Sequence, residues 1–473
     1  MKKNNKIVNP VVTLGGAKAM NDPRDIIDKG AMTTMQFVIV AITVLLNAMD
    51  GFDVLAISVS GPGIMSEWGI DRAQLGVILS MELIGMAFGS ILLGGVADKY
   101  GRRSMTLGCL MVMAFGMYMA TTATSPTTLS LWRVFTGLGI GGMLSTTNAV
   151  VAEFSNNRRR AMCISMMVIG YPIGGIFCGE IGKALLDATG SNWRTMFISG
   201  AVMSAALIPV VYFLVPESIH WLARKQPAGA LEKINAALTK LGHAAVNALP
   251  AIPADLRKKS VLDIFSPSLA MITILVTCAY FFHIITFYYI LKWTPTLVVQ
   301  MGMNASAASG VLTWANVGGA LGGAAFGLLT TRFGLKPLSI AILLLAAVGV
   351  TLFGRSEPNI TSLSYWAAFA GFFGNAGVSG LYSIVAYAFP THVRATGTGF
   401  VIGVGRGGAV LSPMIAGYLL QSGTTLANVG MVMAIGSLLA AGVLCFLKMG
   451  TDKTADAAVT DTKTSPGMKA SMA

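Results

Sequence analysis

The sequence has few charged residues for its length. Only 11% of its 473 residues are Asp, Glu, Lys or Arg, whereas a typical soluble domain has about 25%. Soluble domains of this total length need a polar surface that so few charges can hardly supply, which argues against an ordinary soluble protein. The 54% of hydrophobic residues indicates instead a chain whose solvent is the lipid bilayer.

Cysteine, proline and catalytic patterns are also sparse. The five cysteines are odd in number and lack the spacing of metal ligands, so we interpret them as packing residues and expect no disulfide framework, metal or cofactor. The 17 prolines are too few for a disordered or collagenous chain. The sequence has no Ser-His-Asp order, phosphate loop or signalling domain, so we expect neither an enzyme nor a nutrient sensor.

Long apolar segments dominate what is present. A membrane-spanning helix needs about 20 mostly apolar residues, and twelve segments meet this length. The sequence therefore predicts an all-α membrane protein with twelve transmembrane helices. The segments are 34–58, 73–96, 104–123, 127–151, 161–185, 194–215, 267–293, 304–329, 336–354, 361–388, 395–420 and 426–447.

A polar break divides these segments into two groups of six. We predict an N-terminal tail, a first six-helix bundle, a linker, a second six-helix bundle and a C-terminal tail. Within the linker, Ala228 to Leu241 has helical periodicity. The corresponding ranges are 1–33, 34–215, 216–266, 267–447 and 448–473.

The basic residues predict orientation. The net charge of +13 would suit a nucleic acid, but most Lys and Arg residues stand in the tails and in alternate short loops. Cytoplasmic loops carry such an excess of positive residues. We therefore expect a multi-pass protein of the inner (plasma) membrane with both termini in the cytoplasm, and no nucleic acid partner.

The two halves repeat each other. Asp98 to Arg103 and Thr331 to Lys336 stand at corresponding places, 233 residues apart. Val151 to Ala161 and Val385 to Ala395 match again at an offset of 234 residues. Two such offsets indicate a duplicated six-helix unit, so the bundles should be pseudo-symmetric, with a site at their interface as in many transporters.

The segment from Gly94 to Arg103 resembles the loop signature of the major facilitator superfamily, with Gly94, Asp98, Gly101 and Arg102 at signature positions. Leu129 to Gly137 and Pro216 to Leu222 resemble two further motifs of this superfamily. An Asp at a helix end beside cations can make charge-assisted bonds that break when the protein changes conformation. These four residues are therefore candidates for a gating loop. The alternative is a positive anchor on a tight turn.

Helix 1 carries Asp50-Gly51-Phe52-Asp53, which resembles the signature of the aromatic acid:proton symporter family. The resemblance implies import of benzoate-like acids and a requirement for the acidic pair. Helix 4 departs from the aromatic-acid pattern because it reads Gly-Gly-Met-Leu-Ser-Thr-Thr-Asn over 141–148. This departure leaves open-chain dicarboxylates such as cis,cis-muconate as an alternative substrate class.

Three acidic residues within the spans are candidates for proton coupling. A charge at the centre of a span costs about 2.5 to 3.5 kcal/mol on insertion scales, so Asp50, Asp53 and Glu82 need a reason to be there. Counting along the predicted helices places both Asp residues in the outer half, at a depth similar to that of Arg133. An Asp53–Arg133 pair is thus possible. The alternative for each acid is a structural role.

Arg406 is the main candidate for binding a substrate carboxylate, because a guanidinium presents a planar fork and keeps its proton. It stands in Gly-Val-Gly-Arg-Gly-Gly over 403–408 near the middle of helix 11. The resemblance implies the same role, since organic-anion branches of the superfamily tend to place Arg in this helix. A salt bridge to Glu82 is the alternative, and Arg133 is a second candidate ligand. For Lys292, near the predicted end of helix 7, we expect snorkelling to the interface.

Several uncharged residues complete the candidate site. An aromatic substrate needs flat apolar walls, for which we consider Tyr171, Trp314 and Tyr382. A ring hydroxyl could bind one of four buried polar residues, each of which could instead bond between helices. These four are Asn148, His283, Asn316 and Asn375.

The sequence as a whole predicts a monomeric, proton-coupled symporter that imports small aromatic carboxylates by alternating access. Its partners would be the organic acid, protons and the bilayer. Besides dicarboxylate import, the alternative is a proton-driven exporter of drugs or metabolites. Exporters of this fold usually carry a Gly-Pro step in helix 5, which Tyr171 interrupts here.

Overall fold

The computed structural model describes residues 22–190, 192–250, 261–390 and 393–447, and every regular element in these ranges is helical. Twelve helices are long and apolar enough to cross a membrane. The elements are α1 (Pro23–Lys29), α2 (Thr34–Trp68), α3 (Arg72–Tyr100), α4 (Arg102–Thr121), α5 (Pro126–Glu153), α6 (Arg160–Ala188), α7 (Arg194–Leu214), α8 (Ile219–Lys225), α9 (Ala230–Leu241), the 3-10 helix η1 (Val261–Phe265), α10 (Ala270–Gln300), α11 (Ala305–Leu329), α12 (Leu335–Arg355), α13 (Ile360–Ala388), α14 (Arg394–Gln421) and α15 (Leu426–Phe446).

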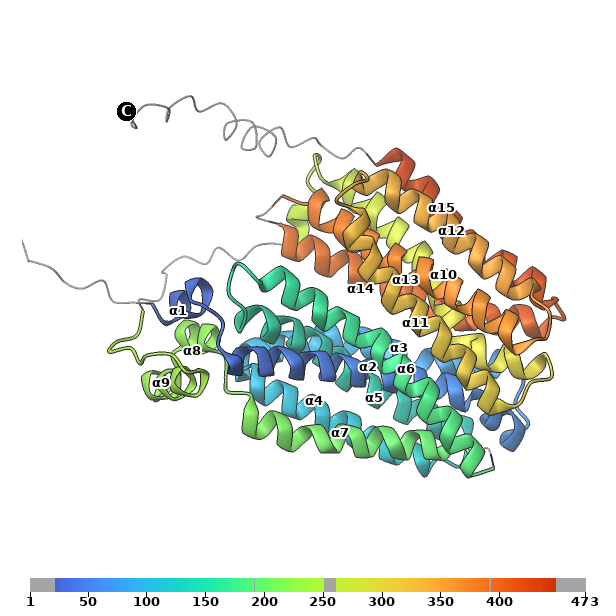
Figure 1. The fold of residues 1–473 in the computed structure, drawn as a ribbon, viewed down its shortest axis with the longest axis horizontal. Coiled ribbons are helices and arrows are strands. Elements are labelled where there is room, and N and C mark those ends of the chain that lie inside the picture. The colour runs from blue at the N-terminus through green and yellow to red at the C-terminus, as the bar shows by residue number, and fades with distance from the viewer. Residues whose placement is uncertain (1–21, 191, 251–260, 391–392, 448–473) are drawn as a thin grey trace, which may run out of the picture.

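The spanning helices form two bundles of six, α2–α7 and α10–α15, which lie side by side in Figure 1. The packing partners repeat between the bundles. Helix α3 packs on α5, α4 on α7 and α2 on α6, and in the second bundle α11 packs on α13, α12 on α15 and α10 on α14. The predicted all-α fold of two pseudo-symmetric bundles is confirmed.

Two spans are longer than predicted. Helix α2 has 35 residues and continues to Trp68, past Pro62, and α10 has 31 residues and continues to Gln300, past Pro295. In these helices the apolar pattern is interrupted by Pro, Ser and Thr, which neighbouring helices can accommodate within a membrane protein. Both extensions place charged residues deeper than their sequence positions indicated.

The segment between the bundles contains η1 and two short α-helices, α8 and α9, and these two lie beside α1 at one end of the molecule (Figure 1). We call this the linker end. The predicted linker helix Ala228 to Leu241 is confirmed as α9, whereas α1 and α8 were not predicted. Residues 1–21, 251–260 and 448–473, which belong to the predicted tails and linker, lie outside the described residues.

The two bundles contact each other through α3–α14, α6–α11 and α2–α10. Close contacts begin at the end opposite the linker, where Gly76 packs on the backbone of Pro413 and Gly61 packs on Thr296. Among the described residues, the hydrogen bond between bundles that lies nearest the linker end joins Arg406 to Ser90. About 15 Å of α3 continues beyond Ser90, and there Ile91 is 74% exposed. The contact between the bundles is therefore concentrated toward the end opposite the linker.

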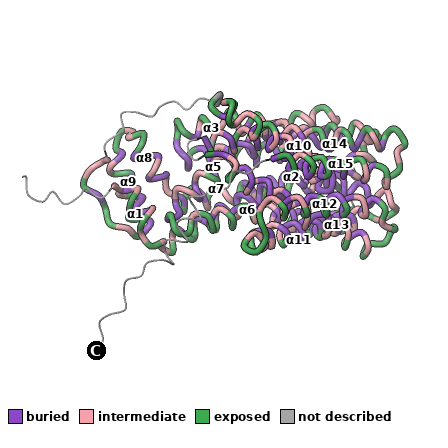
Figure 2. Tube along the Cα trace, turned by 90° about the horizontal axis from the view of Figure 1, so that it is seen from above, coloured by how far each residue is buried: buried purple, intermediate pink, exposed green. Residues whose placement is uncertain are grey.

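Burial follows this arrangement. Figure 2 shows buried residues through the interior of the bundles and exposed residues around the rim and in the turns. Many exposed residues are large and apolar, among them Phe88, Leu131 and Phe446. Such side chains on the outside of a helical bundle are typical of a surface that contacts lipid.

Candidate functional site

Charged side chains gather near the middle of the spans. Five of them are buried and the sixth is partly buried. They come from both bundles and from five different helices. The six residues are Asp50 and Asp53 on α2, Glu82 on α3, Arg133 on α5, Lys292 on α10 and Arg406 on α14.

Close packing of α3 on α5 places Glu82 beside Arg133. A Cβ atom at Gly137 would lie 2.1 Å from the carbonyl oxygen of Glu82, so only glycine permits this approach. Arg133 forms an ion pair with Glu82, and its Nη2 donates to the carbonyl oxygen of Asp53 at 2.8 Å. Both ion-pair side chains are fully buried. The expected Asp53–Arg133 pair thus joins Arg133 to the backbone of Asp53, because the guanidinium takes Glu82 as its carboxylate partner.

Lys292 reaches the same cluster from the second bundle. Its side chain is fully buried, and Nζ lies 3.4 Å from Oε2 of Glu82 and donates to the carbonyl oxygen of Val54. The expectation that Lys292 snorkels to the interface is wrong. Helix α10 continues about 12 Å beyond Lys292, so the ammonium finds an acid in the neighbouring bundle instead of water.

The carboxylates of Asp50 and Asp53, unlike that of Glu82, form no ion pair among the described residues. Both side chains are buried near the middle of α2, deeper than the outer half that we predicted. None of their four carboxylate oxygens has a hydrogen-bond partner among the described residues. Gly51 between them lets α6 approach, since a Cβ there would lie 2.1 Å from the carbonyl oxygen of Tyr171. The Asp-Gly-Phe-Asp segment therefore packs on α6 through Gly51 and holds two acids without hydrogen-bond partners, and Oδ1 of Asp53 lies beside Gly200 of α7.

Arg406 lies where α14 meets α3. Its Nη1 donates to the carbonyl oxygen of Met86 at 3.0 Å and also to the hydroxyl of Ser90. Nη2 and Nε have no protein partner among the described residues, and the side chain is partly exposed. The alternative of a salt bridge to Glu82 is wrong, because Glu82 is paired with Arg133 and Lys292. One edge of the guanidinium therefore remains available to an anion.

Aromatic side chains adjoin this arginine. The rings of Tyr280 and Tyr382 stack at 5.6 Å, and their hydroxyls are 3.2 Å apart. A Cβ at Gly405, next to Arg406, would lie 2.0 Å from the Tyr280 ring. Tyr171 is partly buried and lies beside Tyr288 of α10. Sequence reasoning found Tyr171 and Tyr382 but missed Tyr280, for which the glycines around Arg406 were the available signal.

The remaining uncharged candidates lie away from the cluster or are already bonded. Trp314 is 52% exposed, in a row with Leu321 and Leu328 on the lipid side of α11, so we withdraw it from the site. His283 is buried and uses both ring nitrogens, one with Ser437 and one with the carbonyl oxygen of Gly374. Its hydrogen bonds join helices within the second bundle, which explains a buried histidine without a substrate.

The three asparagines have comparable local roles. Asn316 donates to its own helix at the α6–α11 contact, where Gly175 packs against its side chain. Asn375 donates to the carbonyl oxygen of Gly319 at 2.7 Å and so joins α13 to α11. Asn148 is exposed and donates to Leu144. Of the three, only Asn316 lies at a contact between the bundles, so it alone stays a candidate ligand.

The predicted gating loop forms a network at the linker end. Asp98 pairs with Arg102 at 2.8 Å and with Arg224 of α8 at 3.0 Å, and Arg102 also pairs with Glu153 at 3.3 Å. Gly101 has φ +103°, a backbone conformation that favours glycine. Gly94 lies in the last turns of α3, before this network. The loop thus ties α3, α4 and α5 to the linker helix α8.

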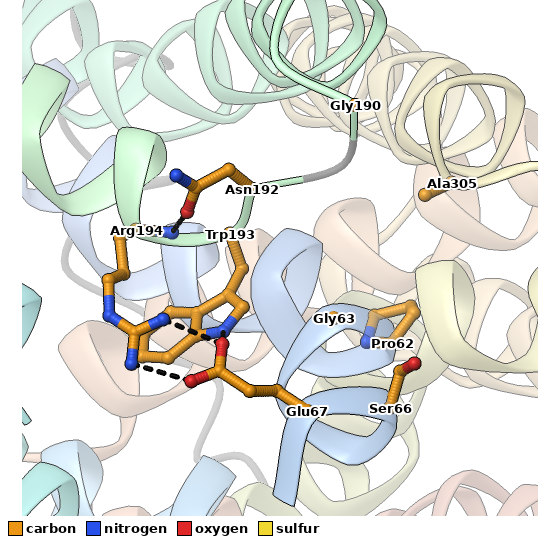
Figure 3. Close-up of a pocket in the computed structure, with 9 residues that line it drawn as sticks. All are labelled: Pro62, Gly63, Ser66, Glu67, Gly190, Asn192, Trp193, Arg194 and Ala305. Carbon is orange, nitrogen blue, oxygen red and sulfur yellow. Dashed lines mark hydrogen bonds and ion pairs between the residues drawn. The ribbon is translucent and has the colours of Figure 1, made fainter. Parts of the chain in front are cut away.

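A cavity of about 540 Å³ lies at the end opposite the linker (Figure 3). Glu67 projects into it and accepts hydrogen bonds from Trp193 at 2.7 Å and from both Nη atoms of Arg194 at 2.6 and 2.7 Å. These polar groups satisfy one another and fasten α2 to α7. No group of three potential metal ligands converges anywhere in the described ranges.

The charged cluster predicts unequal effects of two substitutions. Glu82→Gln leaves the buried charges of Arg133 and Lys292 without an acid, which should cost about 3 to 5 kcal/mol. Lys292→Met leaves the Glu82–Arg133 pair intact and should cost about 1.5 to 3 kcal/mol for the lost charge-assisted hydrogen bond. Thermal unfolding of the purified variants in detergent measures the difference. Equal destabilisation would show that Lys292, and not Arg133, is the principal partner of Glu82.

Comparison with known proteins agrees with this architecture. The family model described as Major Facilitator Superfamily matches residues 43–325 and 278–468. The inward open xylose transporter XylE from E. coli superposes with a TM-score of 0.66 at 19% identity, covering 88% of this chain and 98% of that one. A bacterial homolog of the lysosomal transporter Spinster also reaches 0.66, at 16% identity, with 88% and 97% covered. These structures support the fold.

Similar curated proteins are transporters. The 3-(3-hydroxy-phenyl)propionate transporter of Escherichia coli is 30% identical, covering 86% of this chain and 92% of that protein. The benzoate transport protein of Acinetobacter baylyi is 29% identical, with 84% and 86% covered, and the gallate transporter of Pseudomonas putida is 27% identical, with 85% and 89% covered. The chain therefore belongs to the Major Facilitator Superfamily and is a multi-pass membrane transporter, not an enzyme.

Proposed function

We propose that this transporter imports small aromatic carboxylates together with protons. Three similar proteins are named for gallate, benzoate and 3-(3-hydroxy-phenyl)propionate, all aromatic acids. Arg406 supplies a cationic edge for a carboxylate, and the Tyr280–Tyr382 pair supplies flat walls beside it. Aromatic acids present these two features, an anionic head and a planar ring.

The unpartnered acids carry the proposal for proton coupling. A buried ionised carboxylate without hydrogen bonds is costly, so Asp50 and Asp53 are best accommodated in this conformation with protons bound. The cluster then has three cations, Arg133, Lys292 and Arg406, against the single anion Glu82. A substrate anion offsets part of this excess. Protonation of the acids and binding of the anion therefore support each other.

The contacts between the bundles suggest how the cycle proceeds. We propose that bundles 34–215 and 267–447 rock about the central cluster, and that the present contacts close the outer side. In this orientation the linker end and both termini are cytoplasmic, and the protein lies in the inner membrane as a monomer. Opening outward would separate Lys292 from Glu82 and Arg406 from Ser90, and would give the helix α2 acids access to outside protons.

Uptake into proteoliposomes tests this function. Labelled 4-hydroxybenzoate, benzoate and cis,cis-muconate are offered with the outside one pH unit more acidic than the lumen. Coupling to one proton should concentrate the preferred acid about tenfold, since a pH unit corresponds to about 1.4 kcal/mol per proton. Liposomes without protein correct for passive entry of the neutral acid. Uptake that ignores the gradient would reject symport, and preference for muconate would shift the substrate class to open-chain dicarboxylates.

A further inference from the structure

A groove of about 500 Å³ lies at the linker end, between the first bundle and the α8–α9 hairpin. Three spanning helices end beside it, because α3 stops at Tyr100, α4 starts at Arg102 and α7 stops at Leu214. Its walls combine apolar residues such as Trp221 and Leu222 with basic ones. The groove therefore opens at the level where a bilayer surface meets the protein.

The basic residues of the groove have no acidic partner. Arg103, Lys233 and Lys240 line it, and none forms an ion pair within the described ranges. Arg103 Nη2 donates to the carbonyl oxygen of Tyr212 at 2.6 Å, while its Nε is buried and unbonded. Partial burial and the positive charge of Arg103 together lower the pKa of Lys240. The groove thus concentrates positive charge that the protein does not neutralise.

One carboxylate, that of Glu217, lines the groove, and it accepts hydrogen bonds from backbone N–H groups. Oε1 of Glu217 accepts hydrogen bonds from the backbone N–H groups of Arg102 at 2.7 Å, Arg103 at 3.1 Å and Ser218 at 2.9 Å. It therefore neutralises the start of α4, where an anion is favourable. The side chains of Arg103 and Lys240 gain no carboxylate contact from it.

The outer edge of the groove is apolar and faces lipid. Tyr212 and Phe213, in the last turn of α7, are 54% and 68% exposed. The guanidinium of Arg103 lies 4.9 Å from the centre of the Tyr212 ring, and Lys240 Nζ donates to the carbonyl oxygen of Phe213. Cationic groups thus stand directly above an apolar surface. A phosphate attached to acyl chains matches this combination, whereas a free phosphate would use only the cations.

We propose that this groove binds the phosphate of an anionic phospholipid, with the acyl chains along α7. Arg103 and Lys240 contact the phosphate, and Lys233 on the outer helix adds charge. Because Lys240 and Lys233 belong to α9 while Arg103 belongs to α4, the lipid fastens the linker hairpin to the first bundle. The site is separate from the central cluster, and the proposal does not depend on the transported substrate.

The internal repeat supplies a matched control. Lys336 is the second residue of α12, as Arg103 is of α4, and its Nζ donates to the carbonyl oxygens of Cys445 and Leu447 at the end of α15. The second bundle thus repeats the contact of a cation with the last turn of its sixth helix. No helical hairpin packs there within the described residues.

Native mass spectrometry of the full chain measures the retained lipid. Wild-type protein titrated with phosphatidylglycerol should keep about one lipid that survives delipidation. The double variant Arg103→Gln, Lys240→Gln should lose it, Lys233→Gln should keep less than wild type, and Lys336→Gln should match wild type. Phosphatidylcholine should not replace phosphatidylglycerol. Unfolding temperatures in phosphatidylcholine nanodiscs establish that the variants are folded. If the double variant is not folded, lipid retention by Lys233→Gln serves as the test of the proposal.

Three results would overturn the proposal. The first is equal retention of phosphatidylglycerol by wild type and a folded double variant, or by wild type and Lys233→Gln if the double variant does not fold. The second is equal loss in Lys336→Gln, which would indicate a general surface charge effect. The third is displacement of the lipid by millimolar inorganic phosphate, which would identify the occupant as a soluble anion.

Discussion

Asp53→Asn is expected to abolish proton-driven accumulation while the variant still exchanges substrate across the membrane. Asn has the shape of Asp but cannot release a proton, so it imitates the neutral acid permanently. The Asp53 carboxylate is buried and has no hydrogen-bond partner among the described residues, so the substitution breaks no hydrogen bond of that group. Accumulation across one pH unit should fall from about tenfold to equilibration. Asp50→Asn should have the same effect if the two acids titrate as a pair.

Counterflow separates loss of coupling from loss of folding. Vesicles preloaded with unlabelled acid and held at equal pH should still exchange labelled acid through Asp53→Asn. Asp71→Asn is a suitable control, because Asp71 caps α3 through its contact with Gln74 and Asn is an equally good cap. If Asp50→Asn and Asp53→Asn both accumulated substrate normally, the proton would have to be carried by another group, and Glu82 would be the remaining acid in the cluster.

The number and order of the helices could be predicted because a segment that crosses the bilayer must be a helix of about 20 mostly apolar residues. Ten of the spans lie within a few residues of their predicted ranges, for example α11 and α15. The ends of α2 and α10 could not be predicted, because Pro62 and Pro295 look like terminators in sequence and are accommodated only through neighbouring helices. Lys292 was misplaced for this reason.

Individual charges could be found from sequence, but their partners could not. Each of Glu82, Arg133 and Arg406 stands out in an apolar segment. Which of them pair depends on helix rotation and on close approaches such as Gly137 on Glu82, where a missing Cβ sets the distance between α3 and α5. Tyr280 could not be singled out from sequence, because α10 contains several aromatic residues. Its place beside Arg406 follows only from the packing of Gly405 of α14 against its ring.

Arg406→Lys is expected to weaken binding of the aromatic acid by about 10- to 100-fold. A lysine keeps the positive charge and can still donate to Met86 and Ser90, so the contact between α14 and α3 is retained. It lacks the planar fork, so a carboxylate loses one of its two charge-assisted hydrogen bonds, worth about 1.5 to 3 kcal/mol, and each 1.4 kcal/mol corresponds to tenfold in affinity.

Scintillation proximity binding with labelled acid and purified protein measures this loss directly, without a gradient. Ser90→Ala removes one protein contact of Arg406 but leaves the fork free, so it should bind the acid nearly as well as wild type. Arg355→Lys makes the same exchange at an exposed position and should be silent. Normal affinity in Arg406→Lys would reject a bidentate contact, whereas a matching loss in Ser90→Ala would show that Arg406 acts by holding α14 against α3. The two possible roles of Arg406 therefore give different results. If Arg406 binds the carboxylate, Arg406→Lys loses affinity and Ser90→Ala does not, because only a bidentate contact with the carboxylate depends on the planar guanidinium. If Arg406 acts by holding α14 against α3, Ser90→Ala loses affinity as well.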